Sequence, residues 1–181
     1  MSDPEVLPVS PAKRWNWRRV RGYALQLAIV LVIIGGVRIW QQRDLVSGPA
    51  PARTGILLDG RTVAATVQPG QPMLVHFWAS WCPVCALEQG SIESLAQSYP
   101  TLTVAMQSGP DAEVAAHLRK EALTFPVLND PEGAISTQWG VRAVPTSFIV
   151  DAQGRIRFVE VGYSTGIGLR LRLWWAGLIA E

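Results

Sequence analysis

The chain has 181 residues, of which 49% are hydrophobic and 17% are charged, and its formal net charge is +2. Residues 1–52 contain seven basic and three acidic residues, whereas residues 53–181 contain nine basic and eleven acidic ones. The basic excess belongs to the N-terminal segment, so the rest of the chain gives no sign of binding nucleic acid. Two cysteines in the whole sequence also exclude a domain held together by several disulfides.

The N-terminal segment has the pattern of a membrane anchor. A basic tail at residues 1–21 precedes the run Tyr23–Val37, which contains no charged residue. This run is shorter than the roughly 20 residues that a spanning helix needs, but the apolar residues after Arg38 extend it. We therefore predict one transmembrane helix over residues 22–40. A cleaved signal peptide is the alternative, although the first small-residue cleavage site lies well beyond the apolar run.

The charges around this span predict its orientation. Basic residues precede it in excess, so the positive-inside rule places residues 1–21 in the cytoplasm and the chain after the span outside. In a bacterium this describes a single-pass protein of the inner membrane whose C-terminal domain lies in the periplasm, where disulfides persist. Residues 41–54, rich in Ser, Gly and Pro, are predicted to be a linker, and residues 55–181 suffice for one domain.

The spacing of apolar residues predicts that strands and helices alternate in this domain. An Asp-Gly pair predicts a β-hairpin at Ile56–Val63. Further strands are predicted at Met73–Trp78, Leu102–Met106, Phe148–Val150 and Ile156–Val159, the last two as a hairpin. Helices are predicted at Ala86–Gln97, Asp111–Ala122, Ile135–Trp139 and Thr165–Ala180.

The final segment also fits a strand, because Leu169, Leu171 and Leu173 alternate. The helical spacing is longer, and it runs through Ile167, Leu171, Trp174, Trp175 and Leu178. The longer pattern favours the helix.

The two cysteines lie in the stretch Phe77–Cys85, FWASWCPVC, between a predicted strand and a predicted helix. A thiol at a helix N-terminus faces unpaired backbone N–H groups and the positive end of the helix dipole, which favour the thiolate. We therefore predict that Cys82 is a nucleophile and that Cys85 is the resolving thiol of a redox-active disulfide.

Other roles for this pair are less compatible with its spacing. A structural disulfide across so short a loop adds little stability. A zinc site needs four ligands, and neither His76 nor His117 stands at ligand spacing from the cysteines. Two thiolates can bind copper(I), so a copper-tolerance module remains open.

Three motifs in this order resemble the thioredoxin-like proteins, namely FWASWCPVC, FPVLNDPEGAISTQWGV and AVPTSFIVDAQGRI. The resemblance covers nearly all of residues 55–178 and is to the membrane-anchored TlpA, ResA and cytochrome c maturation branch. It implies an α/β fold with a central mixed sheet flanked by helices. It also implies disulfide exchange without a cofactor other than the redox-active disulfide itself.

The resemblance also suggests roles for residues around the dithiol. Val144 and Pro145 match a Val/Ile-Pro-Thr motif whose cis proline lies against the thiols and whose backbone docks substrate. Trp81 is expected to shape the same docking surface. Glu88 matches an acid that manages protons near the thiols, with a solvated helix-face carboxylate as the alternative. His76 replaces the buried aspartate of thioredoxin, and is either a proton handler or a packed, hydrogen-bonded core residue.

The branch further implies the direction of exchange. Its members reduce protein disulfides, and a DsbD-like membrane reductase would supply the electrons. We therefore expect a periplasm-facing reductase whose partners are protein thiols and disulfides. A disulfide oxidant is the alternative, because the dipeptide between the cysteines does not determine the direction.

Overall fold

The computed structural model describes residues 17–42, 45–51, 54–64 and 70–178. It consists of two compact units, Met1–Trp40 and Gln41–Glu181. Helix α1 (Trp17–Gln42) makes up most of the first unit, and many of its apolar side chains are exposed. No helix in the part of the chain that the structure describes is long and apolar enough to cross a membrane.

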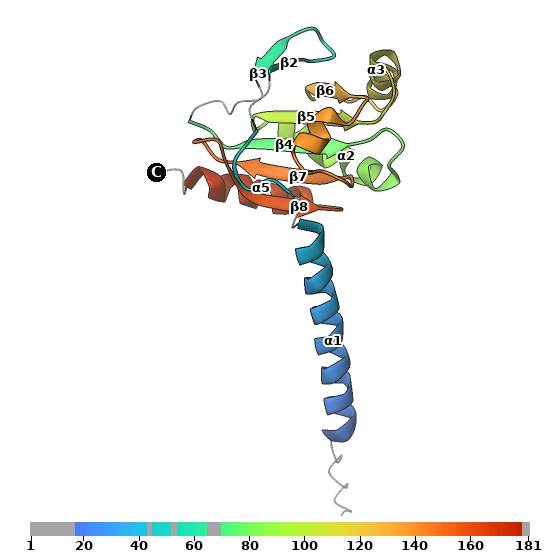
Figure 1. Ribbon diagram of the computed structural model, residues 1–181, viewed down its shortest axis with the longest axis vertical. Helices are drawn as coiled ribbons and strands as arrows, with labels where there is room; N and C mark the ends of the chain where they lie inside the picture. The colour runs from blue at the N-terminus through green and yellow to red at the C-terminus, as the bar shows by residue number, and fades with distance from the viewer. Residues whose placement is uncertain (1–16, 43–44, 52–53, 65–69, 179–181) are drawn as a thin grey trace, which may run out of the picture. The chain divides into compact units, whose positions relative to one another are not determined.

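The second unit is built on a six-stranded mixed sheet (Figure 1). The strand order is β1-β8-β7-β4-β5-β6. From one edge to the other the strands are β1 (Gly48–Pro49), β8 (Arg155–Val161), β7 (Thr146–Val150), β4 (Met73–Trp78), β5 (Thr101–Met106) and β6 (Val127–Asp130). β4 and β6 run parallel to β5, whereas the pairs β4–β7, β7–β8 and β1–β8 are antiparallel. A separate hairpin pairs β2 (Thr54–Ile56) with β3 (Thr62–Ala64).

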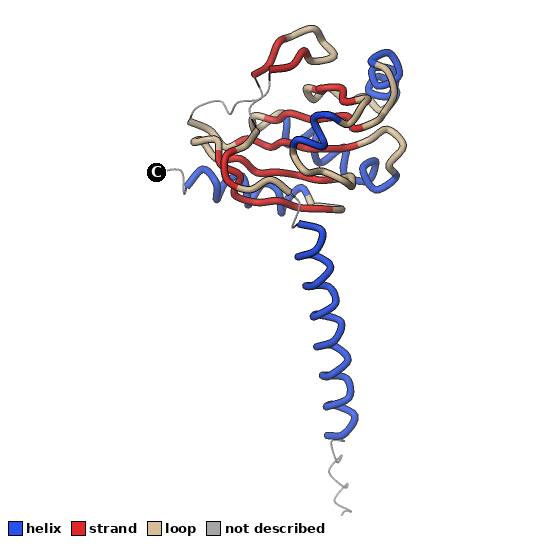
Figure 2. Tube along the Cα trace, viewed as in Figure 1, coloured by secondary structure: helices blue, strands red, loops and turns tan. Residues whose placement is uncertain are grey.

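Helices cover both faces of this sheet, which Figure 2 shows as red strands between blue helices. They are α2 (Pro83–Ala96), α3 (Asp111–Lys120), α4 (Ala134–Gln138) and α5 (Gly166–Leu178). Central strands are therefore buried on both faces and are almost continuously apolar. In β4, Leu74 and Trp78 pack toward the core that includes α2 and α5, whereas Val75 and Phe77 pack toward the opposite core.

These elements confirm the thioredoxin-like α/β fold and each predicted strand and helix of the domain. Two short strands were not predicted. β6 lies within the second motif, and β1 lies within residues 41–54, where a linker was expected. Both escape a periodicity test because two to four residues cannot show a period, and β1 contains Pro49.

Candidate active site

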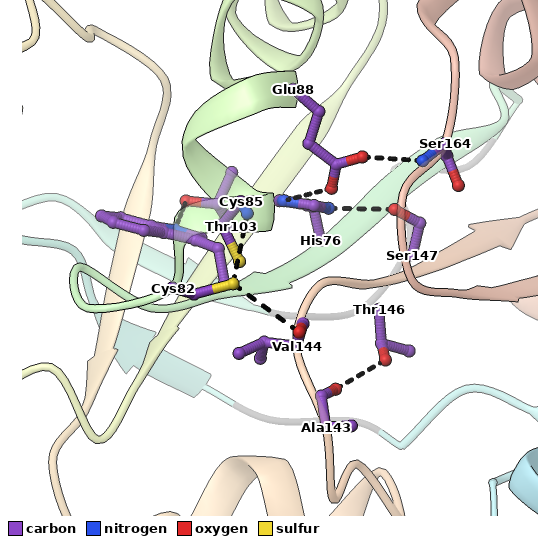
Figure 3. Close-up of polar contacts among 11 residues, drawn as sticks. His76, Cys82, Cys85, Glu88, Thr103, Ala143, Val144, Thr146, Ser147 and Ser164 are labelled. Atoms are coloured by element: carbon purple, nitrogen blue, oxygen red, sulfur yellow. Dashed lines mark hydrogen bonds and ion pairs between the residues drawn. The ribbon is translucent and has the colours of Figure 1, made fainter.

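Cys82 lies at the N-terminus of α2, on the loop that leaves β4. Its backbone is extended (φ −90°, ψ 110°), and its sulfur accepts the backbone N–H of Cys85 at 3.2 Å, so the thiol caps the helix (Figure 3). Pro83 occupies the first turn, where a missing N–H removes no helical hydrogen bond. The helix thus begins at Pro83, directly after the first cysteine and three residues before the start predicted from apolar spacing.

The two thiols have different surroundings. Both are free, but Cys82 is 6% exposed whereas Cys85 is completely buried. Burial raises the pKa of the Cys85 thiol far above its usual range, and the hydrogen bond with Cys82 acts in the same direction. Cys85 therefore needs a nearby proton acceptor before it can act as a nucleophile.

The loop before β7 lies against the first thiol. The peptide bond between Val144 and Pro145 is cis, as the resemblance implied. The Cys82 thiol donates to the Val144 carbonyl oxygen at 3.7 Å. The Thr146 hydroxyl donates to the Ala143 carbonyl, and Gly162 N–H donates to the Pro145 carbonyl, so the loop is held on both sides.

Two tryptophans flank the dithiol in different ways. Trp81 is 61% exposed, and its indole N–H donates to the Gln107 carbonyl at 3.0 Å, which fixes the ring beside the site. Trp78 is buried, and its indole N–H donates to the Thr103 hydroxyl at 3.2 Å. Trp81 is thus available at the surface, whereas Trp78 packs in the core.

Glu88 is buried, which corrects the alternative of a solvated helix-face carboxylate. Its Oε2 accepts the backbone N–H of Ser164 at 2.9 Å, whereas its Oε1 is buried without a hydrogen-bond partner. Burial raises the pKa of Glu88 to about 7, and the Ser164 hydrogen bond opposes this shift. The position was identified from the sequence, but its burial was not, because helical spacing alone does not show what packs on each face.

His76 is a buried, hydrogen-bonded core residue that also contacts Glu88. Its Nδ1 lies 2.9 Å from the Ser147 hydroxyl, and its Nε2 lies 3.7 Å from Glu88 Oε1. Burial lowers the pKa of His76 to about 3. The imidazole is therefore neutral near neutral pH, and its contact with Glu88 is not a pair of opposite charges.

Ser147 is the site residue that sequence reasoning missed. It lies opposite His76 in the antiparallel register of β4 and β7, and both strands are otherwise mostly apolar. A polar residue in each of two buried strands was the available signal, since such residues are expected to satisfy each other. That the two side chains meet follows only from the pairing of β4 with β7.

The described residues include no group of three or more His, Cys, Asp or Glu side chains that could hold a metal ion. His117, to which no role was assigned, approaches Gln89 with its Nε2 at 3.1 Å and packs its ring against Trp78.

Comparisons with known proteins agree with this geometry. The family model described as Redoxin matches residues 45–167. A thioredoxin-like protein of Haemophilus influenzae is 29% identical over 84% of this chain and 92% of its own length. The thiol:disulfide interchange protein DsbE of Xylella fastidiosa is 33% identical over 75% of this chain and 73% of its own.

Among solved structures, a secreted disulfide oxidoreductase of Mycobacterium tuberculosis, described as homologous to E. coli DsbE, superposes with a TM-score of 0.59. It is 25% identical, and the match covers 68% of this chain and 95% of that one. The comparisons do not support a narrower resemblance of the three motifs to suppressor for copper sensitivity protein D.

Proposed function

Because the chain belongs to the Redoxin family and is a DsbE-like thiol:disulfide oxidoreductase, we propose that it reduces protein disulfides through Cys82 and Cys85. The observation that carries this proposal is the placement of the Cys82 sulfur. It caps α2, it is the less buried of the two thiols, and it lies beside the Val144 carbonyl.

Reduction proceeds in two exchanges. The Cys82 thiolate attacks one sulfur of the substrate disulfide, and the other substrate sulfur leaves as a thiolate with the electron pair. The Cys85 sulfur, after losing its proton, attacks the Cys82 sulfur of the mixed disulfide and releases the second substrate thiolate. The substrate gains two electrons, and the protein is left with a Cys82–Cys85 disulfide.

The substrate peptide would dock beside the first thiol. Val144 offers backbone groups that an extended peptide can pair with, in the manner of an added strand. The exposed Trp81 ring, one residue before Cys82, offers apolar contact. Both features would hold the substrate sulfur near Cys82, the less buried of the two thiols.

We also propose that residues 22–40 anchor the protein in the bacterial inner membrane with its C-terminal domain in the periplasm. The described residues contain no helix that meets the length and hydropathy of a span. This part of the proposal therefore rests on the uncharged run and on the basic residues before it. In that compartment a reductase needs an electron source, for which a DsbD-like membrane reductase is suited.

The thiol state in cells tests the direction. Thiols of the full chain are trapped with acid and alkylated in cells with and without the DsbD-like reductase. We expect a largely reduced dithiol that becomes oxidised when the reductase is deleted. A dithiol that stays oxidised in unmodified cells, and depends on a DsbB-like oxidase, would identify a disulfide oxidant instead.

Two serine variants test the roles of the thiols. Cys85→Ser retains the attacking thiol and should accumulate mixed disulfides with cellular proteins. Cys82→Ser should trap none and should lack activity toward a model protein disulfide. The opposite pattern would reverse the roles, and stoichiometric copper(I) binding by the full chain without turnover would favour the copper alternative.

A further inference from the structure

His76 lies between two buried side chains and faces each with one ring nitrogen. Nδ1 is 2.9 Å from the Ser147 hydroxyl, and Nε2 is 3.7 Å from Glu88 Oε1 (Figure 3). All three residues are at least 98% buried, and Oε1 has no hydrogen-bond partner. Buried polar atoms in native proteins nearly always have a partner. A carboxylate oxygen without one, directed at a ring nitrogen, therefore indicates a contact that forms in another state of the site.

The chemistry of the imidazole shows which states these are. A neutral imidazole has one nitrogen that donates and one that accepts, whereas a hydroxyl group can do both. If Nδ1–H donates to Ser147, then Nε2 can accept a hydrogen bond from protonated Glu88. If Ser147 donates to Nδ1, then Nε2–H can donate to the Glu88 carboxylate. The imidazole held by Ser147 thus suits both protonation states of Glu88 without becoming charged.

We propose that His76 is a positioning residue for Glu88, which accepts the proton of Cys85 when the disulfide closes. Before the transfer Nε2–H donates to the Glu88 carboxylate, and the ring keeps this proton while Glu88 takes the proton of Cys85. Once Glu88 is protonated, exchange of the ring proton with water gives the tautomer that accepts from the carboxylic acid, and Ser147 then accepts from Nδ1–H. This inference rests on the proposed function, because only a dithiol that closes requires a proton to leave Cys85.

The step conserves protons and electrons. The Cys85 proton goes to Glu88 Oε1 while the electron pair of the Cys85 sulfur forms the bond to the Cys82 sulfur. The bond from Cys82 to the substrate sulfur breaks, and that sulfur leaves as a thiolate with the electron pair. When a reductant opens the Cys82–Cys85 disulfide, Glu88 returns the proton to Cys85.

The groups around Glu88 in the described structure come from four elements. β4 contributes His76, α2 contributes Cys85, and β7 contributes Ser147 through the ring. The segment before α5 contributes the Ser164 backbone N–H, which holds the other carboxylate oxygen in place. Of these groups only Cys85 and His76 titrate, so the protonation of Glu88 is coupled to theirs.

The resolving step can be measured directly on the reduced full chain in detergent. Cys82 attacks the chromogenic disulfide 5,5′-dithiobis(2-nitrobenzoate) and releases one coloured thiolate. Cys85 then resolves the mixed disulfide and releases the second. The rate of the second release, followed by stopped flow between about pH 5 and pH 9, should rise with pH as the proton acceptor becomes available.

Two substitutions should move the midpoint of this profile in opposite directions. His76→Leu removes the donor to the carboxylate, so the midpoint should rise by about one pH unit. Ser147→Ala leaves Nδ1 without a partner. A buried N–H without an acceptor is less tolerated than a bare nitrogen, so the proton should move to Nε2 and stabilise the carboxylate. The midpoint should then fall by about half a pH unit.

Thr103→Val is the matched control. It also removes a buried strand hydroxyl, but Thr103 bonds Trp78 and the Pro126 carbonyl, so the midpoint should not move. Shifts of the same sign in the two site variants, or no shift, would overturn the role of His76. If His76→Leu does not fold, the sign of the Ser147→Ala shift decides alone. If the wild-type protein releases no second thiolate at any pH, the proposed dithiol exchange itself fails.

Discussion

Cys82 and Cys85 are separated by one helical turn, and the surroundings of their side chains change completely over that distance. Cys82 caps the helix beside the loop with the cis Val144–Pro145 bond, whereas Cys85 is enclosed in the core on the side of α2 that contains Glu88. We therefore expect access to decide which thiol attacks, and the buried acid and imidazole to control the thiol that resolves.

The titrations of Glu88 and His76 should change the free energy of unfolding with pH in opposite directions. Burial raises the pKa of Glu88 from 4.5 to about 7, so the folded state keeps a proton that the unfolded state loses, and stability falls as pH rises through this window. Burial lowers the pKa of His76 from 6.5 to about 3, so stability rises with pH through that window. Between pH 4.5 and 6.5 the two contributions oppose each other.

Glu88→Gln removes the contribution of Glu88 to this pH dependence and leaves that of His76. The free energy of unfolding of the variant should rise across the shared window by about 2 kcal/mol, whereas that of the wild type should change much less. Urea unfolding of the reduced protein at several pH values measures both. Glu132→Gln, at an exposed carboxylate, should retain the wild-type profile. Parallel profiles for Glu88→Gln and the wild type would show that Glu88 does not titrate in this range.

At the scale of elements, α5 is a helix with apolar side chains on two faces. Leu169, Leu173 and Ala176 are completely buried against the sheet and α2. The stripe from which the helix was predicted is instead exposed, with Leu171 at 61%. The spacing therefore predicted the helix but not which of its faces is buried, because both faces have the same period.

This difference can be measured. Leu173→Ala should lower the free energy of unfolding by about 2–5 kcal/mol, because it removes buried methyl groups and leaves a cavity. Leu171→Ala makes the same chemical change at an exposed position and should alter stability by less than about 0.5 kcal/mol. Urea unfolding of the two variants compares them directly, and equal losses would place both side chains in the core.

In the site, too, the sequence located the elements but did not show which face of each is buried. The dithiol, the strand before it and the proline loop are local patterns, so they could be located from the sequence. Leu87 fits the apolar spacing of α2 yet is 74% exposed, while the acid one position later is buried. That choice depends on the packing of α2 against α5 and on the pairing of β4 with β7, which no local pattern contains.

At the scale of the whole molecule, the chain has two units with different compositions, Met1–Trp40 and Gln41–Glu181. If residues 22–40 form the anchor, the full chain should remain in the membrane fraction after an alkaline wash. A chain without residues 1–40 should appear in the soluble fraction with its exchange activity retained. Fractionation followed by immunoblotting measures this.

Full-length Cys82→Ser is the control for that experiment. It cannot attach to membrane proteins through a mixed disulfide, so it should still sediment with membranes. Release of the full chain by the alkaline wash would contradict the anchor.

The route by which the chain enters the second unit has a mechanical consequence. β1 pairs through only two residues with the start of β8, and the neighbouring Val46 and Ala50 amides bond to Trp139 and Gly154. A pulling force on the N-terminal segment would load these few contacts at the sheet edge first. β4 and β7, which support the thiols and the proline loop, lie further inside the sheet. Force on the N-terminal segment would therefore separate β1 from β8 before it distorted the site around Cys82.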